Sequence, residues 1–141
     1  MSLFVDTSVW YAAVDASDAS NTRAKAILTR DEPLVCTDHV LTETWTMLRN
    51  RIHRHAAERF WDELRSGTAM IEPVGTADLE AAWQIGLIYR DQDFSLVDRT
   101  SFAVMQPWVL TAPLPLMTTS RYSGSVPNVA TPLRLSAKAS H

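Results

Sequence analysis

The sequence predicts an α/β fold, a three-layer α/β/α sandwich built around a mostly parallel sheet. Short apolar segments that suit buried strands alternate with longer segments that suit helices, which is typical of a parallel sheet covered on both faces. The chain has 141 residues, of which 46% are hydrophobic, so it can bury one core but not two. It has four glycines, which favours helices and short connections over a β-sandwich rich in tight turns.

The first half of the chain carries two expected strands and four expected helices. Leu3-Phe4-Val5 and Leu34-Val35-Cys36 are short apolar runs, which predict buried strands. Side chains that favour helix N-caps precede the segments with helical spacing. The expected order is a strand at 3–5, helices that begin after Asp6 and near Asn21, a strand at 34–36, and helices over about 38–51 and 55–64.

The second half is expected to add one strand and two helices before its composition changes. A strand is expected at 69–71, where Pro73 closes it. Helices are expected over 76–89 and from the cap Ser95 to Met105. We therefore expect a folded domain over residues 1–106.

Residues 107–141 differ from the preceding chain in composition. They contain five of the seven prolines, and no Asp or Glu follows Asp98 anywhere in the sequence. Only 109–111 and 114–118 are weak strand candidates, because prolines remove the donors that a sheet needs. The composition predicts a poorly ordered tail and a sheet whose last strand is missing or replaced.

Charge and cysteine content exclude several classes of protein. The net charge of −3 argues against a strongly basic nucleic-acid binder, though not against a nuclease with an acidic site. The single cysteine, Cys36, cannot form an intramolecular disulfide. The first residues lack the features of a signal peptide, and no stretch approaches the roughly 20 apolar residues of a membrane span. We expect a cytoplasmic protein without membrane contact.

Asp6 and Glu43 are two acidic residues whose positions allow more than one role. Asp6 ends the first expected strand, at the edge where ligands bind in α/β folds, but it could also cap the next helix. Glu43 lies at the border of a helical apolar arc that includes Val40 and Leu48. A border carboxylate could simply point to solvent. Position alone leaves both questions open.

Asp98 is the third acidic residue, and its surroundings are more apolar. The segment around it carries apolar side chains on nearly every face, which indicates a buried helix. An unpaired buried carboxylate would cost several kcal/mol, so Asp98 needs a partner. Ser95, three residues earlier, could form a capping box with it, or Asp98 could face a metal ion. The spacing does not decide between these two partners.

The three acids occur in three motifs that together resemble a known family. The motifs are Phe-Val-Asp-Thr-Ser-Val-Trp, Leu-Thr-Glu-Thr-Trp and Phe-Ser-Leu-Val-Asp-Arg-Thr-Ser-Phe-Ala-Val-Met. In this order the chain resembles PIN-domain ribonucleases, specifically the VapC-type toxins of type II toxin–antitoxin systems, over about residues 1–106. The resemblance implies a PIN-like fold and a metal-dependent endoribonuclease that hydrolyses RNA phosphodiester bonds.

The resemblance also implies the site residues and the partners. Asp6, Glu43 and Asp98 would be the catalytic acids and would bind Mg²⁺ or Mn²⁺, which prefer hard oxygen ligands. Thr7 and Ser8 would be supporting or substrate contacts. Asp93 would be an additional acid or only a residue at the entry to a helix. The implied partners are an RNA substrate, a cognate antitoxin protein and a second copy in a homodimer.

The sequence departs from the family after Met105, and this abrupt loss of resemblance suggests that residues from about Gln106 onward are translated out of the ancestral reading frame. PIN domains commonly add a fourth acid after the helix that carries the Asp98-type residue, and this chain has none there. This favours a rival interpretation, a non-catalytic or weakly active PIN-like protein that only binds an antitoxin or dimerises. A haloacid dehalogenase-type phosphatase is excluded, because Ser8 stands where that family needs a second Asp.

Basic and aromatic side chains form the remaining candidate features. The basic concentration could be a solvated helical face or a contact with RNA phosphates. The tryptophans at helical apolar positions favour core or dimer packing over base stacking. The residues are Arg49, Arg51, His53, Arg54, His55, Arg59 and Arg65 for the basic group, and Trp45, Trp61 and Trp83 for the aromatic group.

Overall fold

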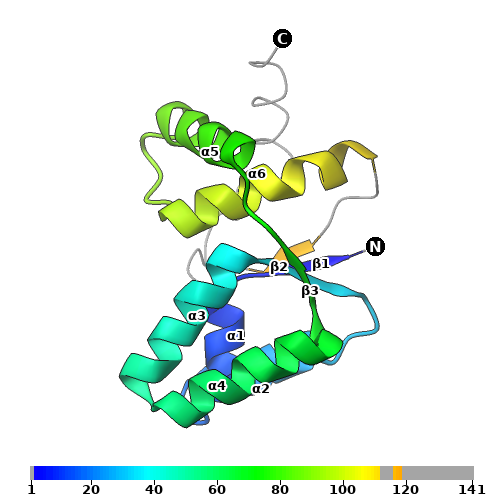
Figure 1. The fold of residues 1–141 in the computed structure, drawn as a ribbon, viewed down its shortest axis with the longest axis vertical. Coiled ribbons are helices and arrows are strands. Elements are labelled where there is room, and N and C mark those ends of the chain that lie inside the picture. The colour runs from blue at the N-terminus through cyan, green and yellow to red at the C-terminus, as the bar shows by residue number, and fades with distance from the viewer. Residues whose placement is uncertain (1, 112–115, 119–141) are drawn as a thin grey trace.

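The computed structural model describes the backbone of residues 2–111 and 116–118 and the side chains of residues 2–106. In this part of the chain, a four-stranded parallel sheet lies between two layers of helices (Figure 1). Its strand order is β3-β2-β1-β4. The strands are β1 (Leu3–Val5), β2 (Leu34–Thr37), β3 (Met70–Glu72) and β4 (Leu116–Thr118). The predicted α/β class is confirmed.

The helices follow the strands in the alternation that the sequence predicts. Four helices cover one face of the sheet, and two cover the other (Figure 1). The first group is α1 (Thr7–Val14), α2 (Asn21–Leu28), α3 (Asp38–Arg51) and α4 (Arg54–Glu63). The second group is α5 (Thr76–Ile88) and α6 (Leu96–Thr111).

Alternation along β1 divides the core into two clusters. Successive side chains of a strand point to opposite faces of the sheet. Leu3 and Val5 therefore pack with buried residues of α1, α3 and α4, while Phe4 packs with Phe102 and other buried residues of α5 and α6. Together the two clusters bury the three β1 side chains, each of which is 3% exposed or less. The end of β1 is thus held firmly between the two helical layers.

The structure extends two elements beyond the predicted limits. Helix α6 continues past Met105 and Pro107 to Thr111. Strand β4 pairs in parallel with β1, with Leu3 opposite Leu116 and Val5 opposite Thr118, in a segment that is only a weak strand candidate by sequence. The expectations for the rest of 107–141, including poor order and an altered reading frame, concern residues outside those that the structure describes.

A short π-helical turn at Leu64–Thr68 connects α4 to β3. Within it, Gly67 has φ +100, a left-handed backbone conformation that glycine adopts without steric cost. Leu64 stays buried at 3% exposure, so the turn anchors the end of α4 in the core before the chain reverses into β3. Among the helices of the described residues, none has the length and apolar character that a membrane crossing requires.

Candidate functional site

Asp6 lies at the carboxyl end of β1 and caps α1. Its carboxylate oxygen Oδ1 accepts hydrogen bonds from the Ser8 hydroxyl (2.7 Å) and from the Val9 backbone N–H (3.3 Å). The residue is 5% exposed. The capping role that the sequence left open is therefore real, and it fixes the carboxylate at the edge of the sheet where ligands bind in α/β folds. Capping and ligand binding are compatible, since a carboxylate can accept several bonds.

Asp98 lies in the first turn of α6, after a loop and not directly after a strand. It forms a reciprocal capping box with Ser95, in which Asp98 Oδ2 accepts from the Ser95 backbone N–H (3.0 Å) and Ser95 Oγ accepts from the Asp98 backbone N–H (3.1 Å). Asp98 is 6% exposed. The capping box, one of the two partners considered from the spacing, is confirmed. The carboxylate is consequently buried in a fixed orientation at the N-terminus of the helix.

Glu43 extends from the middle of α3 and is only half-buried. It lies one turn after Val40, which is 1% exposed, and next to Thr44, which is fully buried. This confirms its predicted place at the border of the apolar face. The glutamate is thus less constrained than the two aspartates.

The elements that carry the three acids meet in one part of the core. Val5 and Val9 flank Asp6, Val40 precedes Glu43 by one turn, and Val97 precedes Asp98. Val5, Val9 and Val40 are buried members of one hydrophobic cluster, and the partly buried Val97 packs against it. Helix α3 contacts α1, α6 and β2. Packing therefore brings the backbone segments that carry Asp6, Glu43 and Asp98 to the same cluster.

Chemically, three carboxylates are the hard oxygen donors that Mg²⁺ and Mn²⁺ prefer, so the donor type fits such a cation. Within residues 2–106, however, no group of three His, Cys, Asp or Glu side chains lies close enough to hold a metal ion.

The residues next to Asp6 differ in their contacts. The Ser8 hydroxyl donates to the Asp6 carboxylate and so orients it. The Thr7 side chain is 4% exposed, and its Oγ1 has no hydrogen-bond partner among the described residues. A buried hydroxyl without a partner costs roughly 1–3 kcal/mol, so Thr7 is available to a ligand or to water. Asp93, which the sequence offered as an additional acid or a residue at the entry to a helix, is exposed in the loop before α6.

The basic residues lie on the last turn of α3, on α4 and on the π-helical turn that follows α4. Arg54, Arg59 and Arg65 each lie within 4.0 Å of a carboxylate, those of Glu58, Glu63 and Asp62 respectively, and all six side chains are at least 42% exposed. Arg51 instead lies over the Tyr11 ring, 5.4 Å from its centroid. Three of the five arginines are therefore partly neutralised, as in a solvated helical face.

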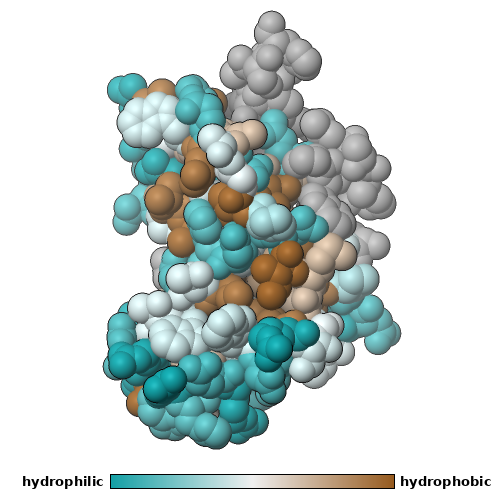
Figure 2. Space-filling model, in the orientation of Figure 1, coloured by the Kyte–Doolittle hydropathy of each residue, from teal (hydrophilic) through white to brown (hydrophobic). Residues whose placement is uncertain are grey.

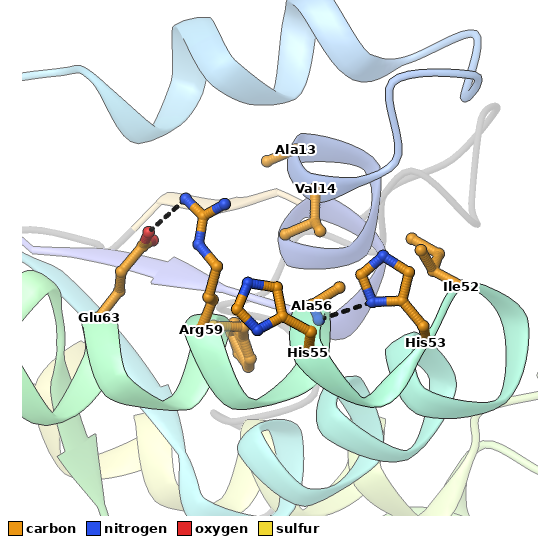
Figure 3. Close-up of a pocket in the computed structure, with 9 residues that line it drawn as sticks. Ala13, Val14, Ile52, His53, His55, Ala56, Arg59 and Glu63 are labelled. Atoms are coloured by element: carbon orange, nitrogen blue, oxygen red, sulfur yellow. Dashed lines mark hydrogen bonds and ion pairs between the residues drawn. The ribbon is translucent and has the colours of Figure 1, made fainter.

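A cavity of about 370 Å³ opens between α4 and the end of α1 (Figure 3). His53, His55, Arg59 and Glu63 lie on its α4 side, and Val14 of α1 lies opposite them (Figure 3). His53 is the N-cap of α4, since its Nδ1 accepts from the Ala56 backbone N–H at 3.0 Å. At least one of these polar side chains thus has a structural role in the helix.

Apolar surface lies elsewhere, over α5 and beside Trp61. Leu79, Trp83 and Leu87 follow one another at four-residue spacing on α5 and are 44%, 61% and 40% exposed. Trp61, at 44% exposure, borders a cavity of about 280 Å³ that Leu41, Thr42 and Trp45 also line. Figure 2 shows hydrophobic surface over the α5 and α6 region, whereas the surface over α4 is mainly hydrophilic.

The single thiol takes no part in these surfaces. Cys36 lies in β2 at 2% exposure, and burial together with the negative charge of Asp38 raises its pKa to about 12. The thiol is therefore neutral and shielded at physiological pH, and it packs in the core as a small apolar side chain.

Comparison with known proteins identifies relatives of this chain. Residues 3–107 match the PIN domain family. The chain is 42% identical over 106 residues to the 23S rRNA-specific endonuclease VapC20 of Mycobacterium tuberculosis, in both strain H37Rv and strain CDC 1551, covering 74% of this chain and 80% of the relative. The crystal structure of M. tuberculosis VapC20, described as a sarcin-ricin loop cleaving toxin, superposes with a TM-score of 0.71 at 36% identity, over 76% of this chain and 83% of that one.

Proposed function

The chain belongs to the PIN domain family as a VapC-type endoribonuclease toxin, and we propose that Asp6, Glu43 and Asp98 hold a divalent cation with which it hydrolyses RNA. The observation that carries this assignment is the burial of Asp6 and Asp98, at 5% and 6% exposure, each fixed at the start of a helix. Two buried carboxylates held in fixed directions are hard oxygen donors of the kind that Mg²⁺ and Mn²⁺ prefer.

Each residue of the proposed site has a distinct task. Asp6 and Asp98 present carboxylates whose directions are fixed by Ser8 and by Ser95. Glu43, half-buried and on a longer side chain, can adjust its position to complete the donor set. When bound, Mg²⁺ or Mn²⁺ supplies Lewis-acid polarisation of the phosphate and a more acidic bound water. The unpartnered Thr7 hydroxyl can hold a phosphate oxygen or the attacking water next to Asp6.

The substrate we assign is ribosomal RNA, through the relatives. VapC20 is named as an endonuclease specific for 23S rRNA, and its structure as that of a toxin that cleaves the sarcin-ricin loop. Identity of 42% over 106 residues, together with a PIN domain match over residues 3–107 that includes all three acids, supports the same substrate class here. An rRNA substrate would also make the cytoplasm the place of action.

The apolar surfaces support the proposed protein partners. A cognate antitoxin and a second copy of the chain both need apolar area to bury, and contiguous exposed apolar residues mark such interfaces. The Leu79–Trp83–Leu87 stripe and the cavity beside Trp61 provide this area on two different parts of the surface. Light scattering at micromolar concentration, with and without the antitoxin, measures both associations.

A divalent-metal titration tests the proposed function. A synthetic stem-loop with the sarcin-ricin sequence is incubated with the full chain at increasing Mg²⁺ or Mn²⁺, and the products are separated on a gel. We expect cleavage at a single main position that stops in EDTA and returns with added metal. A scrambled stem-loop of equal length is the substrate control.

The rival function, binding without catalysis, predicts a different result. No Asp or Glu follows Asp98, so the chain lacks the fourth acid common in the family. This interpretation predicts that no metal-dependent cleavage occurs. An antitoxin complex without any metal-dependent cleavage at high Mn²⁺ would establish the non-catalytic protein. Equal cleavage in EDTA would refute the metal site.

A further inference from the structure

A hydrogen bond joins the helix that carries Glu43 to the helix that carries Asp98. Thr100 Oγ1 on α6 lies 3.3 Å from His39 Nδ1 on α3, although 61 residues separate them in sequence. Thr100 is fully buried, and His39 is half-buried. The contact therefore belongs to the interface between the two helices and not to the solvated surface.

The direction of this hydrogen bond can be assigned from the second contact of Thr100. Its hydroxyl has one hydrogen and lies 3.0 Å from the Val97 carbonyl oxygen, which can only accept. The hydroxyl thus donates to Val97, and its oxygen accepts from His39. His39 must then carry its hydrogen on Nδ1.

The two partners lie close in sequence to the proposed metal-binding acids. His39 precedes Glu43 by four residues, so both side chains project from the same face of α3. Thr100 follows Asp98 by two residues in the first turns of α6, where the capping box with Ser95 already fixes the Asp98 carboxylate. The contact between His39 and Thr100 therefore links α3 to α6 close to Glu43 and Asp98.

From this geometry we infer that His39 is a positioning residue of the nuclease site. By donating Nδ1–H to Thr100, it sets the separation of α3 and α6, and with it the distance between Glu43 and Asp98. The inference rests on the proposed function, because it gives these two carboxylates a common cation. His39 acts through Thr100 and the helices and does not touch the RNA.

The first test measures Mn²⁺ binding to the RNA-free full chain by calorimetry. His39→Ala and Thr100→Val each remove one partner of the hydrogen bond, and we expect each to weaken Mn²⁺ binding by about 5- to 10-fold. The double variant should be no weaker than either single variant, because both remove the same interaction. His39→Asn and Thr100→Ser, which retain a donor and an acceptor, should restore most of the affinity.

Thr46→Val is the matched control for Thr100→Val. The Thr46 hydroxyl also donates to a carbonyl of its own helix, that of Thr42 at 2.8 Å, but it is exposed. We expect this variant to bind Mn²⁺ within twofold of the wild type. In cleavage assays at a fixed Mn²⁺ concentration, His39→Ala and Thr100→Val should lower kcat by about the factor by which they weaken Mn²⁺ binding. KM for RNA should not change.

Imidazole ¹⁵N chemical shifts provide a readout that does not depend on metal or RNA. The wild-type His39 should show the Nδ1–H tautomer, and Thr100→Val should convert it toward the Nε2–H form. An Nε2–H tautomer in the wild type, or normal Mn²⁺ affinity in both His39→Ala and Thr100→Val, would overturn the inference alone. If the wild-type protein binds no Mn²⁺, the proposed metal site fails and this inference fails with it.

Discussion

The acidic and the basic parts of this molecule hold their charges in opposite ways. Asp6 and Asp98 are buried, at the starts of α1 and α6, and their carboxylates are fixed by local hydrogen bonds. The arginines on α4 and on the π-helical turn after it are exposed and pair loosely with neighbouring carboxylates. Both regions are conspicuous in the sequence, but only the first has the rigid surroundings that chemistry on a phosphate requires.

The difference follows from where each region lies relative to the sheet. The acids follow β1 or lie on helices that pack against the strands, so core packing determines their positions. The outer face of α4 points to solvent, while Phe60 and Ala57 on its inner face pack in the core. Charge on this outer face is screened by water and salt, and each pair there contributes little. Predictions that compare the two regions therefore differ greatly in expected size.

The largest effect is expected from removing one charge in the acidic region. Asp6→Asn and Asp98→Asn should each lower metal-dependent RNA cleavage by about a thousandfold or more, roughly 4 kcal/mol on the activation barrier. Asparagine is also a good N-cap, so its side-chain oxygen can keep the bonds to Val9 or to Ser95. The melting temperature should therefore stay within a few degrees of the wild type, as measured by circular dichroism.

This comparison separates catalysis from folding. Arg54→Gln, a charge removal on the exposed α4 face, is the matched control and should retain cleavage within about threefold. Cleavage at the wild-type rate by either Asn variant would show that the site is assigned to the wrong residues. Loss of cleavage together with unfolding would instead assign the aspartates to the fold.

The sequence predicted the fold more completely than it predicted the site. Short apolar runs and helix-capping residues indicated β1, β2, β3 and all six helices, because burial and capping act locally along the chain. The continuation of α6 past Pro107 was not predicted, since an interior proline usually ends a helix. Pairing of β4 with β1 joins segments more than a hundred residues apart, and no local pattern encodes such a contact.

For the site, local patterns identified the acids but could not choose their partners. The three-residue spacing of Ser95 and Asp98 allowed a capping box or a metal ion, and only the structure showed the capping box. The contact between His39 and Thr100 was not predicted, because it depends on how α3 and α6 pack. The one sequence signal for it is the placement of His39 one turn before Glu43. The metal-binding role of the acids stays a prediction.

The second largest effect is expected in the core beneath the basic face. Phe60→Ala should lower the free energy of unfolding by about 3 kcal/mol, because it leaves a cavity on the inner face of α4. The ring is 4% exposed and lies 5.7 Å from that of Trp10, on the helix that Asp6 caps. Urea denaturation measures the loss, and Trp61→Ala on the exposed face should cost less than half as much. Equal losses would mean that the inner face of α4 is not the stabilising one.

A smaller effect is expected at the start of α4. His53→Ala should cost about 1 kcal/mol, or roughly 4 °C in melting temperature, because the Ala56 N–H loses its acceptor. His55→Ala is the control, since His55 is exposed and makes no hydrogen bond within the described residues. If both variants lose the same stability, the imidazole of His53 does not act as a cap.

The smallest effect is expected from the exposed ion pair between Arg59 and Glu63. The two charged groups are 4.0 Å apart, and the side chains are 70% and 66% exposed, so water screens them strongly. A double-mutant cycle with Arg59→Gln and Glu63→Gln should give a coupling free energy below about 0.5 kcal/mol, and this coupling should shrink further in 0.5 M salt.

The Arg59→Gln and Glu63→Gln variants also test whether the exposed face of α4 binds RNA. If Arg59 contacts the phosphate backbone, Arg59→Gln should raise KM strongly at low salt and less at high salt, whereas Glu63→Gln should lower KM. We expect changes in KM below about threefold for both, because a partly neutralised, exposed arginine adds little to a site whose phosphate chemistry lies with the buried acids.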